Sequence, residues 1–481
     1  MTNLPRMLVY LGNGQRRIYW DKEKLRAFQE RKLHSIVKYA YDFVPFYHRK
    51  FKESKVLPSN IKHLSDLSKL PIIKKDEIKR QSIRHLISLQ FDPANLKTVR
   101  TSGSTGQPFQ IFLTGAEDDW RKSIYMRANI NCGQKPRDHW VVLTSPYHFS
   151  DTTNLQRRLG IFAQNCVSVF SSTPQQLKQV EEARPNVLDG YSGSLFLLAK
   201  EARRQGRDSI NPRMMFGTAE YVGENSIKFI EHTFGAPYYD QFGCAEVDRT
   251  AWMCPFKTGY HMDVDSVITE FVDDEGKNTS PGERGEIVYT SLFNFAMPLV
   301  RYAVGDLGIP TDEVCGCGRQ LPLMKAVEGR KKSFLILSDG QLISPNILEV
   351  VMNMFEQFCQ IEQFRIVQKK RDVFKVFIEL DRRVTDQSSF KDKLIKHLVT
   401  NLNQLVPGSN LSEAYFDGSS LIEFPLTKLV SAEQFTQKYL PEEDRRDRMI
   451  LNGSRNLPSV SWWLKALFNN LIAFGHEARG S

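Results

Sequence analysis

The stretch Thr101-Ser102-Gly103-Ser104-Thr105-Gly106-Gln107-Pro108 is rich in glycine and hydroxyl side chains, and an apolar, β-branched run over residues 109–114 follows it directly. Glycine lets the backbone fold tightly and bring its N–H groups toward an anion, and hydroxyls can donate to phosphate oxygens. The stretch therefore has the chemistry of a phosphate-binding loop. The same composition is common in surface turns, so the stretch alone leaves both interpretations open. No lysine follows at the Walker spacing, which excludes the loop of P-loop nucleotidases.

Composition is that of a globular protein of more than one domain. The 481 residues exceed what one hydrophobic core usually serves, so two or three domains are expected. Hydrophobic residues make up 41% and charged residues 25%, and no apolar run is long enough to span a bilayer. The first 20 residues contain only a short apolar run, so we expect no secretory signal and predict a cytoplasmic protein.

The formal charge of +10 is spread over short basic runs. This dispersion favours attraction of small anionic ligands and argues against nucleic acid as a partner. The seven cysteines are an odd number, and two of them form Cys315-Gly316-Cys317. That spacing indicates metal or thiol chemistry rather than a disulfide framework.

The middle of the chain alternates apolar runs with helical patterns. Amphipathic helices are predicted over residues 21–51, before this alternation begins. The apolar runs are 140–144, 167–170, 187–191, 214–218 and 236–242, and the helical patterns between them are 174–183, 194–205 and 224–234. Such alternation predicts an α/β fold with a mostly parallel sheet covered by helices, which binds ligands beyond the carboxyl ends of its strands.

The pattern of apolar residues changes in the second half of the chain. A hairpin turn at 273–277 and an alternating strand at 286–292 predict an antiparallel subdomain. After residue 329, short strands at 334–337, 363–367 and 374–380 surround helices at 346–355 and 388–405. We therefore predict a large domain over 1–328, a small α+β domain over 329–440 and a tail over 441–481.

The tail ends in an apolar helical pattern that runs from Trp462 to Phe474. The pattern is too short to span a bilayer, so this helix is expected to dock on its own large domain or to contact a membrane surface or a partner protein. Its cations are too few to favour a charged membrane.

Four further motifs follow the opening loop in a fixed order. They are Phe242-Gly243-Cys244-Ala245-Glu246, Arg301-Tyr302-Ala303-Val304-Gly305-Asp306, Gly329-Arg330-Lys331-Lys332 and Pro425-Leu426-Thr427-Lys428. With these motifs the chain resembles the adenylate-forming superfamily, and within it the group of phenylacetate-coenzyme A ligases and capsule-biosynthesis homologues. The resemblance implies a large N-terminal adenylate-forming domain and a small, mobile C-terminal domain.

The resemblance also implies an activity. ATP and a carboxylic acid would give an acyl-adenylate and pyrophosphate, and a thiol, with coenzyme A as the expected one, would then capture the acyl group. Two alternatives stay open: transfer of the acyl group to an amine or sugar, and a non-catalytic nucleotide-binding homologue that organises a polysaccharide-assembly complex. The expected partners are a nucleotide and a small carboxylic acid, with a monomer or homodimer as the assembly.

The nucleotide site implied by the resemblance starts at the opening loop, where Thr101, Ser102, Gly103, Ser104, Thr105 and Gly106 would hold the β- and γ-phosphates. Glu246 would help to hold Mg²⁺, with Thr105 as a second oxygen ligand. Asp306 would accept the ribose hydroxyls, and Arg301 would reach phosphate with its planar donor fork. Phe242, Gly243 and the segment Gly217-Thr218-Ala219-Glu220 would lie near adenine, and Arg330 would complete the site. For the segment 217–220, a simple strand-to-helix turn is an equally open interpretation.

Two lysines of the C-terminal motifs have implied roles. Lys428 takes the place of the adenylation lysine, whose compact ammonium suits the oxygens that bridge carboxylate and α-phosphate. Its context departs from the family because Thr427-Lys428-Leu429 lacks the usual glycine. Lys332 matches the hinge about which the small domain rotates between the two half-reactions.

A Cys/His set is independent of ATP. Cys254-x6-His261 and Cys315-x-Cys317 supply three thiolates and one imidazole, which suit a closed, structural Zn²⁺ site. Buried thiols without metal are the alternative for such a set. Members of the resembled group often have these ligands, so we expect zinc.

The acyl pocket is the least specified site. Tyr147, His148 and Phe216 are its expected walls, and aromatic walls would favour aryl or arylacetyl acids. A packed core would give the same pattern.

Overall fold

The computed structural model describes residues 2–100, 109–149, 152–220 and 222–331 in the N-terminal two thirds of the chain. C-terminal to these it describes 334–336, 342–343, 351–352, 354–370, 373–380, 386–405, 415–417, 421–423 and 427–429. The opening loop 101–108, the hinge residue Lys332, most of the helix predicted at 346–355 and the tail 441–481 lie outside the described residues.

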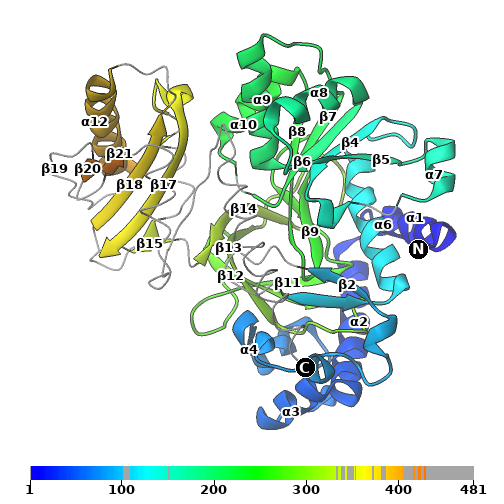
Figure 1. The fold of residues 1–481 in the computed structure, drawn as a ribbon. Helices are drawn as coiled ribbons and strands as arrows, with labels where there is room; N and C mark the ends of the chain where they lie inside the picture. Colours follow the sequence, from blue (N-terminus) through cyan, green and yellow to red (C-terminus); the bar gives the residue numbers. More distant parts are fainter. Residues whose placement is uncertain are drawn as a thin grey trace, which may run out of the picture.

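One large sheet organises the molecule (Figure 1). Its order is β11-β12-β13-β14-β10-β9-β8-β7-β6-β4-β5, with β1 beside β13. The strands are β1 (Ile73–Lys74), β4 (Trp140–Thr144), β5 (Gln164–Ser168), β6 (Val187–Tyr191), β7 (Met214–Thr218), β8 (Tyr238–Cys244), β9 (Asp248–Met253), β10 (Tyr260–Met262), β11 (Val267–Val272), β12 (Gly285–Ser291), β13 (Tyr302–Thr311) and β14 (Leu323–Arg330).

The sheet changes character at β8. From β5 to β8 all neighbours are parallel, whereas β8 to β11 form an antiparallel half, apart from the parallel pair of β1 and β13. The predicted α/β fold with an antiparallel part is therefore confirmed, and the predicted strands agree with the observed ones to within a few residues.

Helices cover both faces of the parallel half (Figure 1). The helices of the large domain are α1 (Leu4–Arg17), α2 (Lys22–Phe43), α3 (Pro45–Glu53), α4 (Lys75–Lys79), α5 (Ile83–Leu86), α6 (Gly115–Asn131), α7 (Asn154–Leu159), α8 (Thr173–Ala183), α9 (Ser192–Gln205) and α10 (Glu224–Phe234). Leu188 and Met215 pack with α8, α9 and α10 in one core. Val187 and Phe216, which alternate with them, belong to the second core, together with α6. Burial on both faces explains why these strands read as continuous apolar runs.

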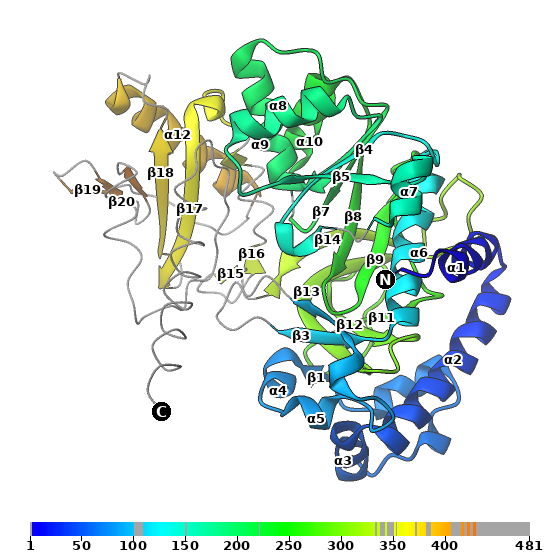
Figure 2. The same cartoon turned by 45° about the vertical axis from the view of Figure 1, so that its right-hand side comes forward.

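Helix α6 follows a hairpin that flanks the opening loop. The strands β2 (Lys97–Arg100) and β3 (Gln110–Leu113) pair in antiparallel fashion across residues 101–108. Thr114 then caps α6 in a capping box with Glu117, in which each side chain accepts from the other's backbone N–H. Figure 2 shows α1 beside α6, and Asp119 of α6 accepts from the backbone N–H of Asn3 (3.1 Å).

The C-terminal part has its own small sheet. Its order is β17 (Ile361–Lys370), β18 (Val373–Leu380) and β21 (Thr427–Leu429), accompanied by α12 (Gln387–Leu405). Two short pairs complete it, β15 (Leu335–Ile336) with β16 (Leu342–Ile343) and β19 (Tyr415–Asp417) with β20 (Leu421–Glu423). The predicted boundary at residue 329 falls near the end of β14, and the division into domains stays a prediction. No described helix is long and apolar enough to cross a membrane.

Candidate functional site

Glu246 lies in a tight turn between β8 and β9. The backbone N–H of Val247 donates to the carbonyl of Cys244 (3.2 Å), which places Ala245 and Glu246 at the centre of the turn. Gly243 at its start approaches the β9 backbone so closely that a Cβ there would lie 2.2 Å from the carbonyl oxygen of Asp248. The motif predicted from the sequence thus forms a rigid strand-to-strand turn, which fixes where the Glu246 side chain begins.

The Glu246 carboxylate is buried and charged. Lys75 Nζ lies 2.8 Å from its Oε1, and the Tyr302 hydroxyl donates to the same oxygen (3.1 Å). Burial alone would raise the pKa of Glu246, but the Lys75 ammonium and the hydrogen bonds outweigh it and lower this pKa below its ordinary value. At neutral pH the site therefore holds a buried carboxylate anion, the type of ligand that Mg²⁺ prefers.

Asp306 lies on β13, the strand that also carries Tyr302. It is buried, and this burial raises its pKa to about 6, against the opposing effect of Arg330. Arg330 is its register partner on β14, and Arg330 Nε lies 3.6 Å from Asp306 Oδ1. The structure thus brings Glu246, Asp306 and Arg330 to one end of the large sheet, as the resemblance implies.

Arg301 does not have the predicted position. Its guanidinium is buried, lies 3.0 Å from Glu270 Oε1, and donates to the carbonyls of Leu70 (2.7 Å) and Gly276 (3.1 Å). Its φ of 46° turns the backbone so that the side chain points into this cluster. Because the donors of its fork are engaged there, we assign Arg301 a structural role in place of the phosphate contact.

The segment predicted to face adenine leaves the carboxyl end of β7. Gly217 lies against Tyr238, since a Cβ at this position would be 1.6 Å from the Tyr238 hydroxyl oxygen. After Thr218 the chain turns at Ala219 with a φ of 69°. Glu220 then accepts from the backbone N–H of Gly193 at the start of α9 (3.0 Å). The turn is thus held in place by the next helix, and Phe242 lies half-buried on β8.

The expected acyl walls lie in different environments. The exposed His148 ends η4 (Pro146–His148), and its Nδ1 is 2.8 Å from the hydroxyl of Tyr191. Phe216 is fully buried on β7 and contacts the ring of Tyr239 (centroids 5.9 Å apart). The side chain of Tyr147 lies outside the described residues, so the predicted acyl pocket stays a prediction.

The Cys/His set forms a compact cluster. The ligand atoms of Cys254, His261, Cys315 and Cys317 all lie within 4.8 Å of one another. Cys254 Sγ is 3.5 Å from Cys315 Sγ, and Cys317 Sγ is 3.3 Å from His261 Nε2. Burial and the nearby Arg319 lower the pKa of His261 to about 4, so its imidazole is neutral, as a metal ligand must be. Three thiols and a neutral imidazole converge as a tetrahedral Zn²⁺ site requires, and the residues fit the expected metal.

Comparison with known proteins finds relatives among coenzyme A ligases. No family model matches the chain. The phenylacetate-coenzyme A ligase of Thermus thermophilus is 28% identical over 69% of this chain and 76% of its own length. The same enzyme of Escherichia coli is 27% identical over 74% of the chain and 83% of its own length, and the CapK protein of Staphylococcus aureus is 22% identical over 70% and 73%. The chain is thus similar to the phenylacetate-coenzyme A ligases and CapK, the group that its motifs resemble.

The fold of this group is confirmed by solved structures. The 2-hydroxyisobutyryl-CoA ligase in complex with an acyl-adenylate has a TM-score of 0.69, covering 95% of this chain and 94% of the other at 18% identity. The anthranilate CoA ligase AuaEII, with anthranoyl-AMP, has a TM-score of 0.50 over 84% of this chain and 74% of the other, at 15% identity. By name, these relatives and structural neighbours are coenzyme A ligases, the class that the resemblance implies.

Lys75 is a residue of the candidate site that the sequence did not reveal. It begins α4 directly after β1, and the parallel pairing of Ile73 with Tyr302 and of Lys74 with Ala303 brings it beside Glu246. A strand of two residues is too short to show a periodic pattern, so no local signal could have found it. The cationic run Lys74-Lys75 is the only trace of it in the sequence.

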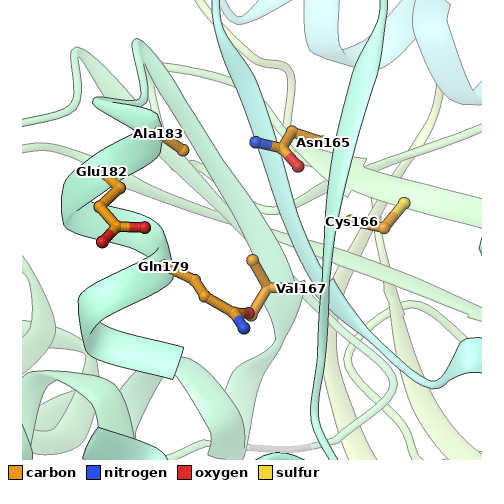
Figure 3. Close-up of a pocket in the computed structure, with 6 residues that line it drawn as sticks. All are labelled: Asn165, Cys166, Val167, Gln179, Glu182 and Ala183. Carbon is orange, nitrogen blue, oxygen red and sulfur yellow. The ribbon is translucent and has the colours of Figure 1, made fainter. Parts of the chain in front are cut away.

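The remaining predicted residues are placed only in part. Lys428 lies on β21, where its backbone pairs with Phe377 of β18, and nothing further is described of its side chain. A hollow of about 430 Å³ lies elsewhere, between β5 at the edge of the sheet and α8 (Figure 3). It is lined by Asn165, Cys166, Val167, Gln179, Glu182 and Ala183, none of which belongs to a predicted motif.

Proposed function

We propose that the chain activates a carboxylic acid with ATP, releases pyrophosphate and transfers the acyl group from the adenylate to coenzyme A. The observation that carries this proposal is the buried, ionised Glu246, fixed by its turn and by Lys75 and Tyr302, next to Asp306 and Arg330. A rigid carboxylate suits Mg²⁺, and a second buried carboxylate beside it suits the hydroxyls of a ribose. Burying such charges does not help the packing of an apolar core.

In the first half-reaction the acid attacks the α-phosphorus of ATP. Glu246, with Thr105 as the second oxygen ligand, would hold Mg²⁺, which neutralises charge on the departing pyrophosphate. The N–H and hydroxyl groups of the opening loop would hold the same phosphates. The ammonium of Lys75 pairs with Glu246, so Lys75 would supply a second positive charge near the phosphates. Lys428 would stabilise the oxygens that bridge acid and phosphorus.

The nucleoside would lie between the carboxyl ends of β7 and β8 and the start of β13. Asp306 would accept the ribose hydroxyls, which needs its ionised form. The turn 217–220 and Phe242 would cover adenine. The close approach at Gly217 and Gly243 keeps both backbones tight against their neighbours, which leaves a shaped, rigid wall.

In the second half-reaction the thiol attacks the acyl carbon and AMP leaves. The small domain would rotate about Lys332, which would move Lys428 out of the site and give the thiol access to the acyl-adenylate. A structural Zn²⁺ at Cys254, His261, Cys315 and Cys317 would hold the loop that precedes this hinge, without contact to the reactants.

Pyrophosphate release tests the proposal. The purified protein is given ATP, Mg²⁺ and a panel of aryl, arylacetic and aliphatic acids, with and without coenzyme A. We expect acid-dependent pyrophosphate release, a coenzyme A thioester as product, and loss of release in Lys428→Ala. Release that needs an amine or sugar instead of coenzyme A would change the acceptor. Nucleotide binding without release for any acid, unchanged by Lys428→Ala, would show a binding protein instead of an enzyme.

A further inference from the structure

The turn that carries Glu246 is held from behind by helix α6. Arg121 of α6 is buried, and its guanidinium donates to the carbonyl oxygens of Ala245 (3.1 Å) and Glu246. These are the two central carbonyls of the tight turn. One planar fork thus fixes the orientation of two successive peptide groups, and with them the direction in which the Glu246 side chain leaves the backbone.

A second arginine makes the reciprocal contact. Arg249, two residues beyond the turn, donates to the carbonyls of Tyr125 (2.7 Å) and Ile124 on α6. It also pairs with the buried Asp263. The helix and the turn are therefore joined in both directions, and the turn cannot shift along α6 without breaking both sets of hydrogen bonds.

Arg121 differs from the other buried arginines in its partners. Arg127, Arg249 and Arg301 each pair with a buried carboxylate. Among the described residues, Arg121 has no such ion pair within 4.0 Å, and its guanidinium donates to the two turn carbonyls. Burying a cation whose partners are backbone carbonyls is costly, because a carboxylate partner would stabilise the charge better. The protein accepts this cost at the Glu246 turn, which suggests that the position of these two carbonyls is important.

Helix α6 also connects the turn to the phosphate side of the site. The helix begins at Gly115, immediately after β3, and β3 begins close to the end of the opening loop. The spacing between the end of β3 and the Glu246 turn is thus set by a single rigid element with Arg121 in its second turn.

We propose that Arg121 is a positioning residue that fixes the Glu246 turn, and with it the Glu246 carboxylate, in the orientation needed to bind a metal ion. This inference rests on the proposed function of Glu246 as a Mg²⁺ ligand. A lysine at position 121 keeps the charge but can satisfy both carbonyls only as a point donor, so the turn loses its fixed orientation.

The test compares Arg121→Lys with Arg127→Lys, a change on the same helix that weakens the ion pairs with Asp263 and Asp265 without touching the turn. Binding of Mn²⁺ with a non-hydrolysable ATP analogue is titrated by calorimetry, and the Mg²⁺ dependence of pyrophosphate release is measured in parallel. Thermal unfolding reports whether each variant is folded.

We expect Arg121→Lys to raise the half-saturating metal concentration by roughly fivefold or more, and Arg127→Lys to lower the Tm without this shift. In a Glu246→Gln background, Arg121→Lys should add no further shift in metal affinity, because the ligand it positions is already lost. A folded Arg121→Lys protein with unchanged metal dependence would overturn the inference alone. A wild-type protein that binds no metal–nucleotide complex would overturn the proposed function, and the inference with it.

Discussion

At the scale of single residues, the site depends on two buried carboxylates with different environments. Glu246 has a cation and a hydroxyl within hydrogen-bond reach, so its charge is stabilised. For Asp306 the cost of burial outweighs the positive charges of Arg330 and Lys75, so its pKa is raised to about 6. The difference suits a permanent metal ligand beside a group that becomes fully ionised when a ligand donates hydrogen bonds to it.

Glu246→Gln should keep the shape of the turn and remove the charge that binds Mg²⁺. We expect pyrophosphate release to fall by at least about 100-fold, because the metal loses its protein anchor while the fold is retained. Steady-state rates over a range of Mg²⁺ concentrations measure this. Glu224→Gln, an exposed carboxylate that pairs only with Lys228 on α10, is the matched control. Equal rates in the wild type and Glu246→Gln would remove Glu246 from the metal site.

Asp306→Asn should separate stability from binding. The folded-state pKa of Asp306 is higher than that of an unfolded Asp, so its ionisation destabilises the fold in full above pH 6 and not at all below about pH 4. The variant should therefore be more stable than the wild type at pH 7–8, by on the order of 1–3 kcal/mol, and the gain should vanish as the pH falls to 4.

Chemical denaturation of nucleotide-free protein at pH 4 and pH 7.5 measures this difference. Nucleotide affinity should change in the opposite direction, with weaker binding in the variant, since an amide accepts ribose hydroxyls less well than a carboxylate. A variant that is less stable at pH 7.5 than at pH 4, relative to wild type, would contradict the assignment.

At the scale of elements, α6 connects the separate parts of the site. Glu117 accepts from the backbone N–H groups of Phe295 (2.6 Å) and Ala296 (2.9 Å). Trp120 stacks on Phe293 with ring centroids 3.7 Å apart. Two turns further along, Arg127 pairs with two aspartates that precede β11. A single helix thereby fixes the β2–β3 hairpin, the Glu246 turn and the segment that leads into β13.

Arg127→Met tests the strength of this helix in the core. The guanidinium is fully buried, 2.6 Å from Asp263 and 2.7 Å from Asp265, so its removal leaves two buried carboxylates with too little positive charge. We expect a loss of about 3–5 kcal/mol in the free energy of unfolding. Lys38→Met removes the exposed pair with Asp42 and should cost less than about 0.5 kcal/mol. Urea denaturation of both variants measures the contrast; similar losses would argue against the network.

Helix α6 also shows which part of the fold could not be predicted from the sequence. The parallel strands are predictable because burial on both faces leaves uninterrupted apolar runs, as in Trp140–Thr144 and Met214–Thr218. Helix α6 is just as buried, but it meets its neighbours through Glu117, Arg121 and Arg127, and these charges conceal its burial from any hydrophobic pattern. Motif order found Glu246 and Asp306. It assigned Arg301 to phosphate because sequence cannot show that Glu270 lies beside it.

At the scale of the whole molecule, the Cys/His cluster joins segments far apart in the chain. Cys254 follows β9, His261 lies on β10, and Cys315 and Cys317 follow β13. Directly after this loop, Arg319 donates to Asn131 at the end of α6, and the backbone N–H of Gln320 donates to Ile18 beyond α1. The cluster therefore anchors the loop on which two helices depend.

Cys315→Ser should remove a zinc ligand and loosen this anchor. We expect stoichiometric zinc in the native protein, its loss in the variant, and a decrease of at least about 2 kcal/mol in stability. Metal content is measured by mass spectrometry, and stability by thermal unfolding with and without a chelator. Cys166→Ser, outside the cluster on β5, is the control and should keep its zinc. A native protein without stoichiometric metal would contradict the zinc site.

The two-residue strand β1 has a consequence for synthesis on the ribosome. Ile73 and Lys74 emerge early, but their partners on β13 are translated only after most of the large domain. The same holds for Arg17, whose partner Asp265 lies 248 residues downstream. Strand β1 and Arg17 must therefore remain without these partners in the nascent chain, and Lys75 cannot be held beside Glu246 by the β1–β13 pair until β13 has left the exit tunnel. Nucleotide binding by the nascent protein should therefore begin only after β13 has emerged, although the opening loop is translated much earlier.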